Sequence, residues 1–168
     1  MTDSESRAYL RKSVISNFWV NLLINGALSG WIFSGSLPVS AWGESPYGPD
    51  LIITGFMLSA ILSAIVIEIH RRKAASGELR AAALEAEWLQ TAAGWSRWKI
   101  SGAIGLFGAT TGLLLAILLS SLADTLSIPL FVALKAIWTG FLAAAIVGPA
   151  ILLGLDLGIR GNPSNPSA

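Results

Sequence analysis

Apolar residues dominate four stretches of the chain, and each stretch is long enough to cross a membrane as a helix. About 20 consecutive apolar residues span the roughly 30 Å hydrocarbon layer of a bilayer. The stretches are residues 13–33, 51–69, 100–122 and 128–155. The pattern predicts an all-α integral membrane protein, a four-helix bundle that forms a single domain over residues 1–168.

The first stretch differs from the others because a polar residue recurs in it at every fourth position. These residues are Ser13, Asn17, Asn21, Asn25 and Ser29. At 100° per helical residue, Asn17 and Asn25 differ by about 80°, so the three amides share one face. Polar groups inside a membrane usually face other helices, a cavity or a partner protein. We therefore predict that this face of the first helix is turned away from lipid.

Small residues form similar repeats in the other three stretches. They are Gly55, Ser59 and Ser63 in the second, Gly105, Gly108, Ala109, Gly112 and Ala116 in the third, and Ala136, Gly140, Ala144 and Gly148 in the fourth. Such repeats let helix backbones approach closely. In the first stretch, Gly26 and Gly30 lie about 160° from the asparagine stripe. We expect this second face to dock a partner, either another subunit or a second copy of the chain.

The composition agrees with the membrane class. The chain is 54% hydrophobic and 12% charged, whereas soluble domains contain about 25% charged residues. A net charge of +1 argues against nucleic acid as a partner, because phosphate binding needs a clustered excess of Lys and Arg. The absence of cysteine removes disulfides, thiolate metal sites and thiol nucleophiles. We predict no metal site and no cofactor.

Basic residues indicate the orientation of the chain. Of the 11 Lys and Arg residues, all except Lys135 precede the first stretch, separate the second from the third, or follow the fourth. The positive-inside rule therefore places both termini and the central connection in the cytoplasm.

The central connection contains a predicted amphipathic helix over residues 77–98, which are rich in good helix formers. Leu84, Trp88, Trp95 and Trp98 share a face if the helix continues through Gly94. This face either lies on the membrane or packs against the cytoplasmic ends of the bundle. Otherwise, it docks a partner protein. Alternatively, the helix extends the third span as a stalk that bends at Gly94.

The outer connections receive simpler interpretations. Residues 34–50 contain several Pro and Gly residues together with Trp42 and Tyr47. They predict a turn-rich loop anchored at the membrane interface, with a binding lid as the alternative. Residues 123–127 are expected to be too few to host a site.

Lys135 needs an explanation because a charged group at the centre of a membrane helix costs about 2.5 to 3.5 kcal/mol. In one interpretation its side chain extends toward the outer surface, to Asp50 or Asp124. In the other it forms a polar pocket with Asn25 and Ser59 at the same depth, with Ser29 and Thr54 nearer the surface.

His70 is the sole histidine. We expect an ordinary interfacial residue, with a haem or pigment ligand as the alternative. Glu68 and Arg72 are four residues apart and predict a helix ion pair.

About 70 residues at the start of the chain resemble the opening half of small, uncharacterised bacterial membrane proteins with four predicted spans. The residues that carry the resemblance are Asn17, Asn21, Asn25, Trp31, Phe33, Pro38, Trp42, Gly43, Asp50 and Phe56. The resemblance implies a multi-pass protein of the bacterial inner membrane. It implies no activity, cofactor or catalytic residue.

Three classes of function remain. The favoured one is a non-enzymatic membrane subunit or accessory protein that packs against a larger assembly in the bilayer, with a lipid or small amphiphile as a further ligand. The alternative is a small homo-oligomeric channel or transporter with the polar pocket of Asn25, Ser59 and Lys135. An intramembrane enzyme has the least support, because the sequence contains no Ser/His, Cys/His, HExxH or paired intramembrane carboxylate pattern.

Overall fold

The protein is described by a computed structural model that covers residues 3–35, 38–43, 46–79 and 87–160. The helices are α1 (Asp3–Ile32), α2 (Tyr47–Ala75), α3 (Glu87–Ala93), α4 (Arg97–Leu122) and α5 (Ile128–Arg160), and the strands are β1 (Val39–Ser40) and β2 (Thr125–Leu126). Helices α2, α4 and α5 are long and apolar enough to cross a membrane. Helix α1 is not among them, since three asparagines interrupt its apolar sequence. The all-α membrane class is thus confirmed with three candidate spans rather than four.

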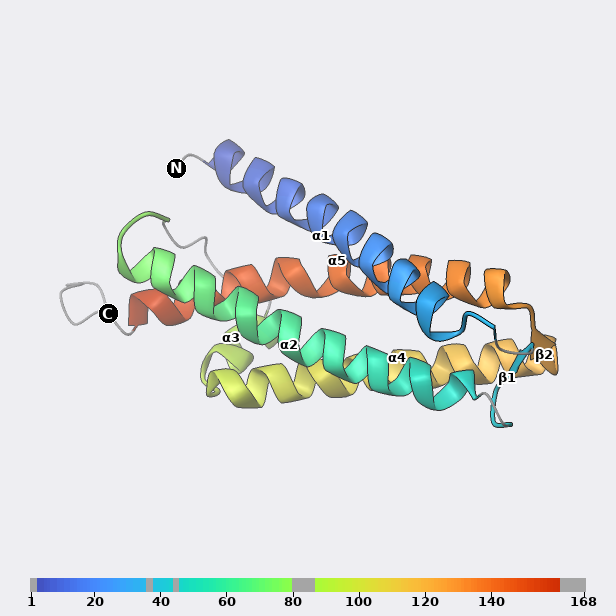
Figure 1. The fold of residues 1–168 in the computed structure, drawn as a ribbon. Helices are drawn as coiled ribbons and strands as arrows, with labels where there is room; N and C mark the ends of the chain where they lie inside the picture. Colours follow the sequence, from blue (N-terminus) through green and yellow to red (C-terminus); the bar gives the residue numbers. More distant parts are fainter. Residues whose placement is uncertain (1–2, 36–37, 44–45, 80–86, 161–168) are drawn as a thin grey trace.

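The long helices pack side by side in a row rather than around a common axis. Helix α1 packs on α5, α5 on α2, and α2 on α4, and no other pair of the described long helices packs extensively. Figure 1 shows α1 along the top of the molecule above α5, while α2 and α4 cross each other in the lower part. A closed four-helix bundle is therefore not confirmed. The row leaves α1 and α4 as edge helices, each with one extensive helix neighbour.

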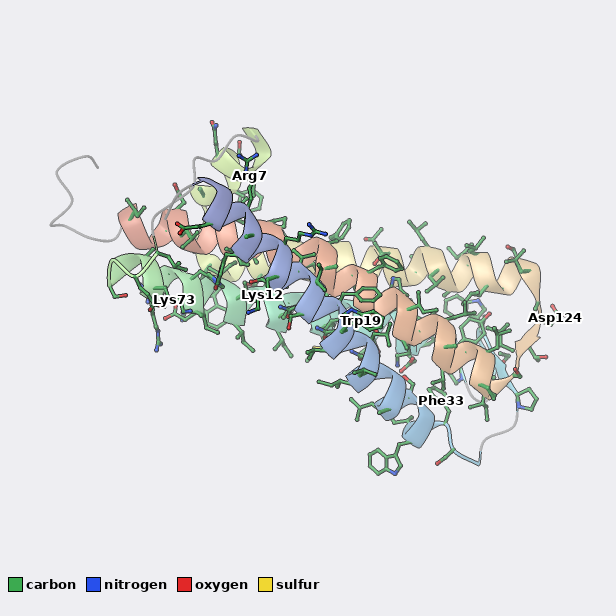
Figure 2. All side chains as sticks on the ribbon, turned by 90° about the horizontal axis from the view of Figure 1, so that it is seen from above. Arg7, Lys12, Trp19, Phe33, Lys73 and Asp124 are labelled. Atoms are coloured by element: carbon green, nitrogen blue, oxygen red, sulfur yellow. The ribbon has the colours of Figure 1, made fainter. Side chains whose placement is uncertain are left out.

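The two ends of the row differ in chemistry. At one end, which we call the basic end, α1 and α4 begin and α2 and α5 finish. Figure 2 shows Arg7, Lys12 and Lys73 gathered there, and Phe33 and Asp124 at the opposite end. At that opposite end, β1 pairs antiparallel with β2, with Val39 opposite Leu126, and we call it the ladder end.

Glycines set the spacing between α2 and α4. A Cβ on Gly55 would collide with the carbonyl of Gly108, and a Cβ on Gly112 would collide with the carbonyl of Leu51. The helices therefore touch backbone to backbone, as their small residues predict. On α5, Gly140 and Gly148 receive α1, whereas Gly154 and Gly158, which the repeat did not include, lie against α2.

The predicted helix over residues 77–98 is wrong as a continuous element. Helix α2 ends at Ala75, and Gly77 follows it in a left-handed conformation, with φ of 77°. Helix α3 ends at Ala93, and the chain turns before α4 starts. Ser96, in an extended conformation at the N-cap position, separates the two helices. Residues 94–96 therefore interrupt the predicted helix, and residues 80–86 of it lie outside the described residues.

The outer connections are more closely joined than the sequence indicated. Residues 123–127 were expected to host nothing, yet they carry β2, which pairs with β1 in the other outer connection. Tyr47 was expected at the membrane interface, but it is fully buried against Phe131, with ring centroids 5.6 Å apart. Trp42 remains exposed, as expected for an interfacial side chain.

Candidate functional site

The polar stripe of α1 lies along the seam between α1 and α5. The two helices run antiparallel over most of their length. The contacting pairs are Val14 with Gly148, Phe18 with Gly140, Gly26 with Ala136, and Phe33 with Phe131. Within this seam Asn21 and Ser29 are buried, whereas Asn17 and Asn25 are half-buried. The stripe is thus buried at Asn21 and Ser29 and only partly covered at Asn17 and Asn25.

The asparagine amides are bonded within α1. The side-chain nitrogens of Asn17, Asn21 and Asn25 donate to the carbonyl oxygens of Ser13, Asn17 and Asn21, at 2.9, 2.9 and 3.0 Å. No described residue donates a hydrogen bond to any of the three amide oxygens. The Oγ of Ser29 is buried and also lacks a partner among the described residues. The seam therefore retains hydrogen-bonding capacity that this chain leaves unused.

Gly26 does not belong to a second, opposed interface, and that expectation is wrong. Its Cα faces α5, where an added Cβ would lie 3.2 Å from the Cβ of Ala136. Gly30 has nothing within 4 Å of an added Cβ and is half-buried. Gly26 lies only about 60° around the helix from Ser29, so both residues can face α5, although Gly26 and Gly30 taken together lie opposite the asparagines.

Lys135 forms an ion pair with Asp50, one of the two partners expected for it. Its Nζ lies 2.6 and 2.8 Å from the two carboxylate oxygens. The Lys135 side chain is 4% exposed and that of Asp50 is 23% exposed. The pair joins α5 to the first turn of α2 beside the aromatic cluster of Phe33, Tyr47 and Phe131. This arrangement neutralises the lysine and ties two helices together.

The residues of the expected polar pocket are not brought together by any described contact. Ser59 is fully buried at the α2–α4 crossing, where it lies against Gly108. Asn25 lies on the α1–α5 seam, and Lys135 binds Asp50 instead. Thr54 is half-buried on α2. Ser59 and Lys135 thus have structural roles in helix packing, and the pocket expected around them and Asn25 is not formed by the described residues.

The expected tryptophan face is only partly described. Leu84 and the side chain of Trp88 lie outside the described residues. Trp95 lies in the turn between α3 and α4, and Trp98 is 67% exposed on α4, with the Arg97 guanidinium 4.7 Å from its ring centroid. Because α3 ends at Ala93, these two tryptophans do not belong to one helix with Trp88.

A polar cluster at the basic end was only partly foreseen. The predicted pair of Glu68 and Arg72 is present at 2.6 Å, and Arg71 and Arg97 also bind the same carboxylate. His70 is buried: its Nδ1 lies 2.8 Å from the carbonyl of Val66, and its Nε2 lies 2.8 Å from the Tyr9 hydroxyl. Tyr9 was missed because sequence spacing does not relate residues on different helices.

Comparison with protein-family models, with curated proteins and with solved structures finds no match for the chain.

Proposed function

We propose that this protein is a non-enzymatic integral membrane subunit that packs laterally, through α1, against another protein of a bacterial inner membrane. One observation carries the proposal: Asn17 and Asn25 lie half-buried on an edge helix, with amide oxygens that no described residue engages. Polar groups left open to hydrocarbon are unfavourable, and an adjacent helix is the usual way to cover them.

The seam supports a membrane location for α1. Because α1 lies antiparallel along α5 from Val14 to Phe33, these residues share the depth of a candidate spanning helix. The uncovered side of α1 is apolar through its centre, with Trp19, Leu23, Ile24 and Leu28 each about half exposed or more. The proposal includes a four-pass arrangement, with the basic end expected in the cytoplasm from the positive-inside rule.

The partner is expected to present a helix with hydrogen-bond donors toward Asn17 and Asn25. Interhelical hydrogen bonds in membranes contribute about 0.6 kcal/mol each on average. Two such bonds select a register and orientation, while the apolar contacts beside them supply most of the affinity.

Site-directed crosslinking tests the proposal cleanly, because the chain contains no cysteine. A cysteine in place of Ile24, which is exposed beside the asparagines, should crosslink in native membranes to one different membrane protein, identified by mass spectrometry. The matched control is Leu114→Cys on α4, at the opposite edge of the row and similarly exposed. It should give no such adduct.

The double variant Asn17→Leu/Asn25→Leu, combined with Ile24→Cys, makes the test specific for the polar seam. We expect the adduct to fall severalfold while the amount of folded protein is unchanged. An adduct between two copies of this chain would contradict the proposal and support the homo-oligomeric alternative. An adduct that is insensitive to both substitutions would also contradict it.

A further inference from the structure

A groove of about 670 Å³ opens between α4 and α5 at the basic end of the row. Ala92 of α3 and Trp95 of the turn after α3 also line the groove. Apart from Thr91, every side chain that lines it is apolar. The groove is bounded by α3, α4 and α5, whereas the seam lies between α1 and α5. The two sites are therefore on different sides of α5.

The groove exists because α4 and α5 both pack on α2 and not extensively on each other. Where their facing sides diverge, the small side chains of Ala103 and Ala145 leave the space open, and both are exposed. Pro149 lies in the wall on α5. These residues belong to α4 and α5, both of which are long and apolar enough to cross a membrane.

The groove has the shape of a site for a single extended chain. Its wall on α4 runs from Ile100 to Phe107, and its wall on α5 runs from Leu153 to Ala145. At 1.5 Å per residue these walls are about 10 to 12 Å long. They reach from the basic end toward the middle of the membrane, which is the path of a lipid acyl chain.

Positive charge flanks the mouth of the groove. On α4, Arg97 and Lys99 lie on either side of the groove-lining face, at about 70° and 90° from it. Arg97 is already bound to Glu68 at 2.7 Å, whereas Lys99 is exposed and makes no ion pair with a described residue. Ser96 forms no side-chain cap, so the first N–H groups of α4 are not bonded by it. Together these groups suit a phosphate.

We propose that the groove binds one anionic glycerophospholipid, with an acyl chain along Ala103, Phe107 and Ala145 and its phosphate beside Lys99. The basic residue Lys99, directly before the groove-lining residues of α4, favours this occupant over a zwitterionic lipid, and the apolar lining suits an acyl chain. The site is separate from the α1 seam and does not depend on it.

The test uses the full-length protein in vesicles that contain phosphatidylglycerol with a photoactivatable acyl chain. After illumination, the labelled peptides should map to the groove, between residues 103 and 107 of α4 and between 145 and 149 of α5. The same experiment with phosphatidylcholine should label these peptides at least threefold less. Equal labelling by both lipids would overturn the proposed selectivity for an anionic headgroup.

Two variants separate the chain site from the headgroup site. Ala103→Phe fills the groove and should reduce labelling by both lipids at least fivefold. Lys99→Gln leaves the groove open and should remove only the preference for phosphatidylglycerol. Both replaced side chains are exposed, so neither change disturbs the core.

Ala27→Phe provides the matched control, because it adds the same bulk to an exposed alanine on α1, away from the groove. It should leave labelling unchanged. Thermal unfolding and gel-filtration profiles confirm that each variant is folded, and Ala145→Phe replaces Ala103→Phe if the latter is not. Equal labelling of the groove-filling variant and the control would overturn the proposal, as would crosslinking of the groove to a protein segment.

Discussion

The ladder end and the basic end both carry charged side chains, but these differ in their exposure to solvent. At the ladder end a single lysine, Lys135, is withdrawn from solvent and matched with a single carboxylate, Asp50. At the basic end Glu68 gathers Arg71, Arg72 and Arg97, whose side chains remain 39 to 76% exposed. One end excludes water, and the other keeps its cations at the surface.

The helices are also packed more tightly around the charges of the ladder end than around those of the basic end. Phe33 packs edge to face against Phe131 at the ladder end, with Tyr47 tilted against the same ring, and β1 pairs with β2 there. At the basic end α4 and α5 separate, and a groove opens between them. The ladder end is therefore closed by aromatic packing and paired strands, whereas the basic end leaves an apolar groove open.

The largest predicted effect breaks the ion pair of the ladder end. Asp50→Asn leaves the ammonium of Lys135 buried without an anion, and should lower the free energy of unfolding by about 3 kcal/mol. Lys135→Met should cost less, because Asp50 is more exposed and lies in the first turn of α2, where helix N–H groups favour negative charge. Unfolding in mixed detergent micelles measures both. Equal losses would show that the two partners are equally buried.

The second prediction compares the packing of two glycines, Gly112 and Gly102, on the same helix, α4. Gly112→Ala places a Cβ against the Leu51 carbonyl, in the half of α4 nearer the ladder end, and should destabilise the protein by about 2 kcal/mol. Gly102→Ala, nearer the basic end, meets nothing within 4 Å. It should be neutral or stabilising by up to about 1 kcal/mol, the difference in helix propensity. The same unfolding assay compares them, and similar losses would mean that α4 is packed equally tightly along its length.

These differences between the ends were only partly predictable from the sequence. The small-residue repeats of α2 and α4 correctly predicted close packing, because helix periodicity alone places Gly105, Gly108 and Gly112 on one face. The reach of Lys135 to Asp50 was one of two alternatives, since side chains on a helix point toward its N-terminus.

Other features depend on contacts that no local pattern encodes. A four-residue repeat indicates that one face of a helix is packed, but it does not indicate which helix packs on it. Neither the order of the helices in the row nor the position of Gly26 against α5 could therefore be derived. The pairing of β1 with β2 joins segments more than 80 residues apart. The groove results from a divergence of α4 and α5, which depends on how each packs on α2.

The smallest predicted effect concerns the charge cluster of the basic end. Glu68→Gln removes the carboxylate shared by Arg71, Arg72 and Arg97, but the exposed arginines are then hydrated by water. The loss should be about 1 kcal/mol or less, and should shrink further as salt is raised. The loss for Asp50→Asn should depend less on salt, because the Lys135 side chain is only 4% exposed. Unfolding at low and high salt measures both variants. A salt-independent loss for Glu68→Gln, as large as that for Asp50→Asn, would show that the basic end is as closed as the ladder end.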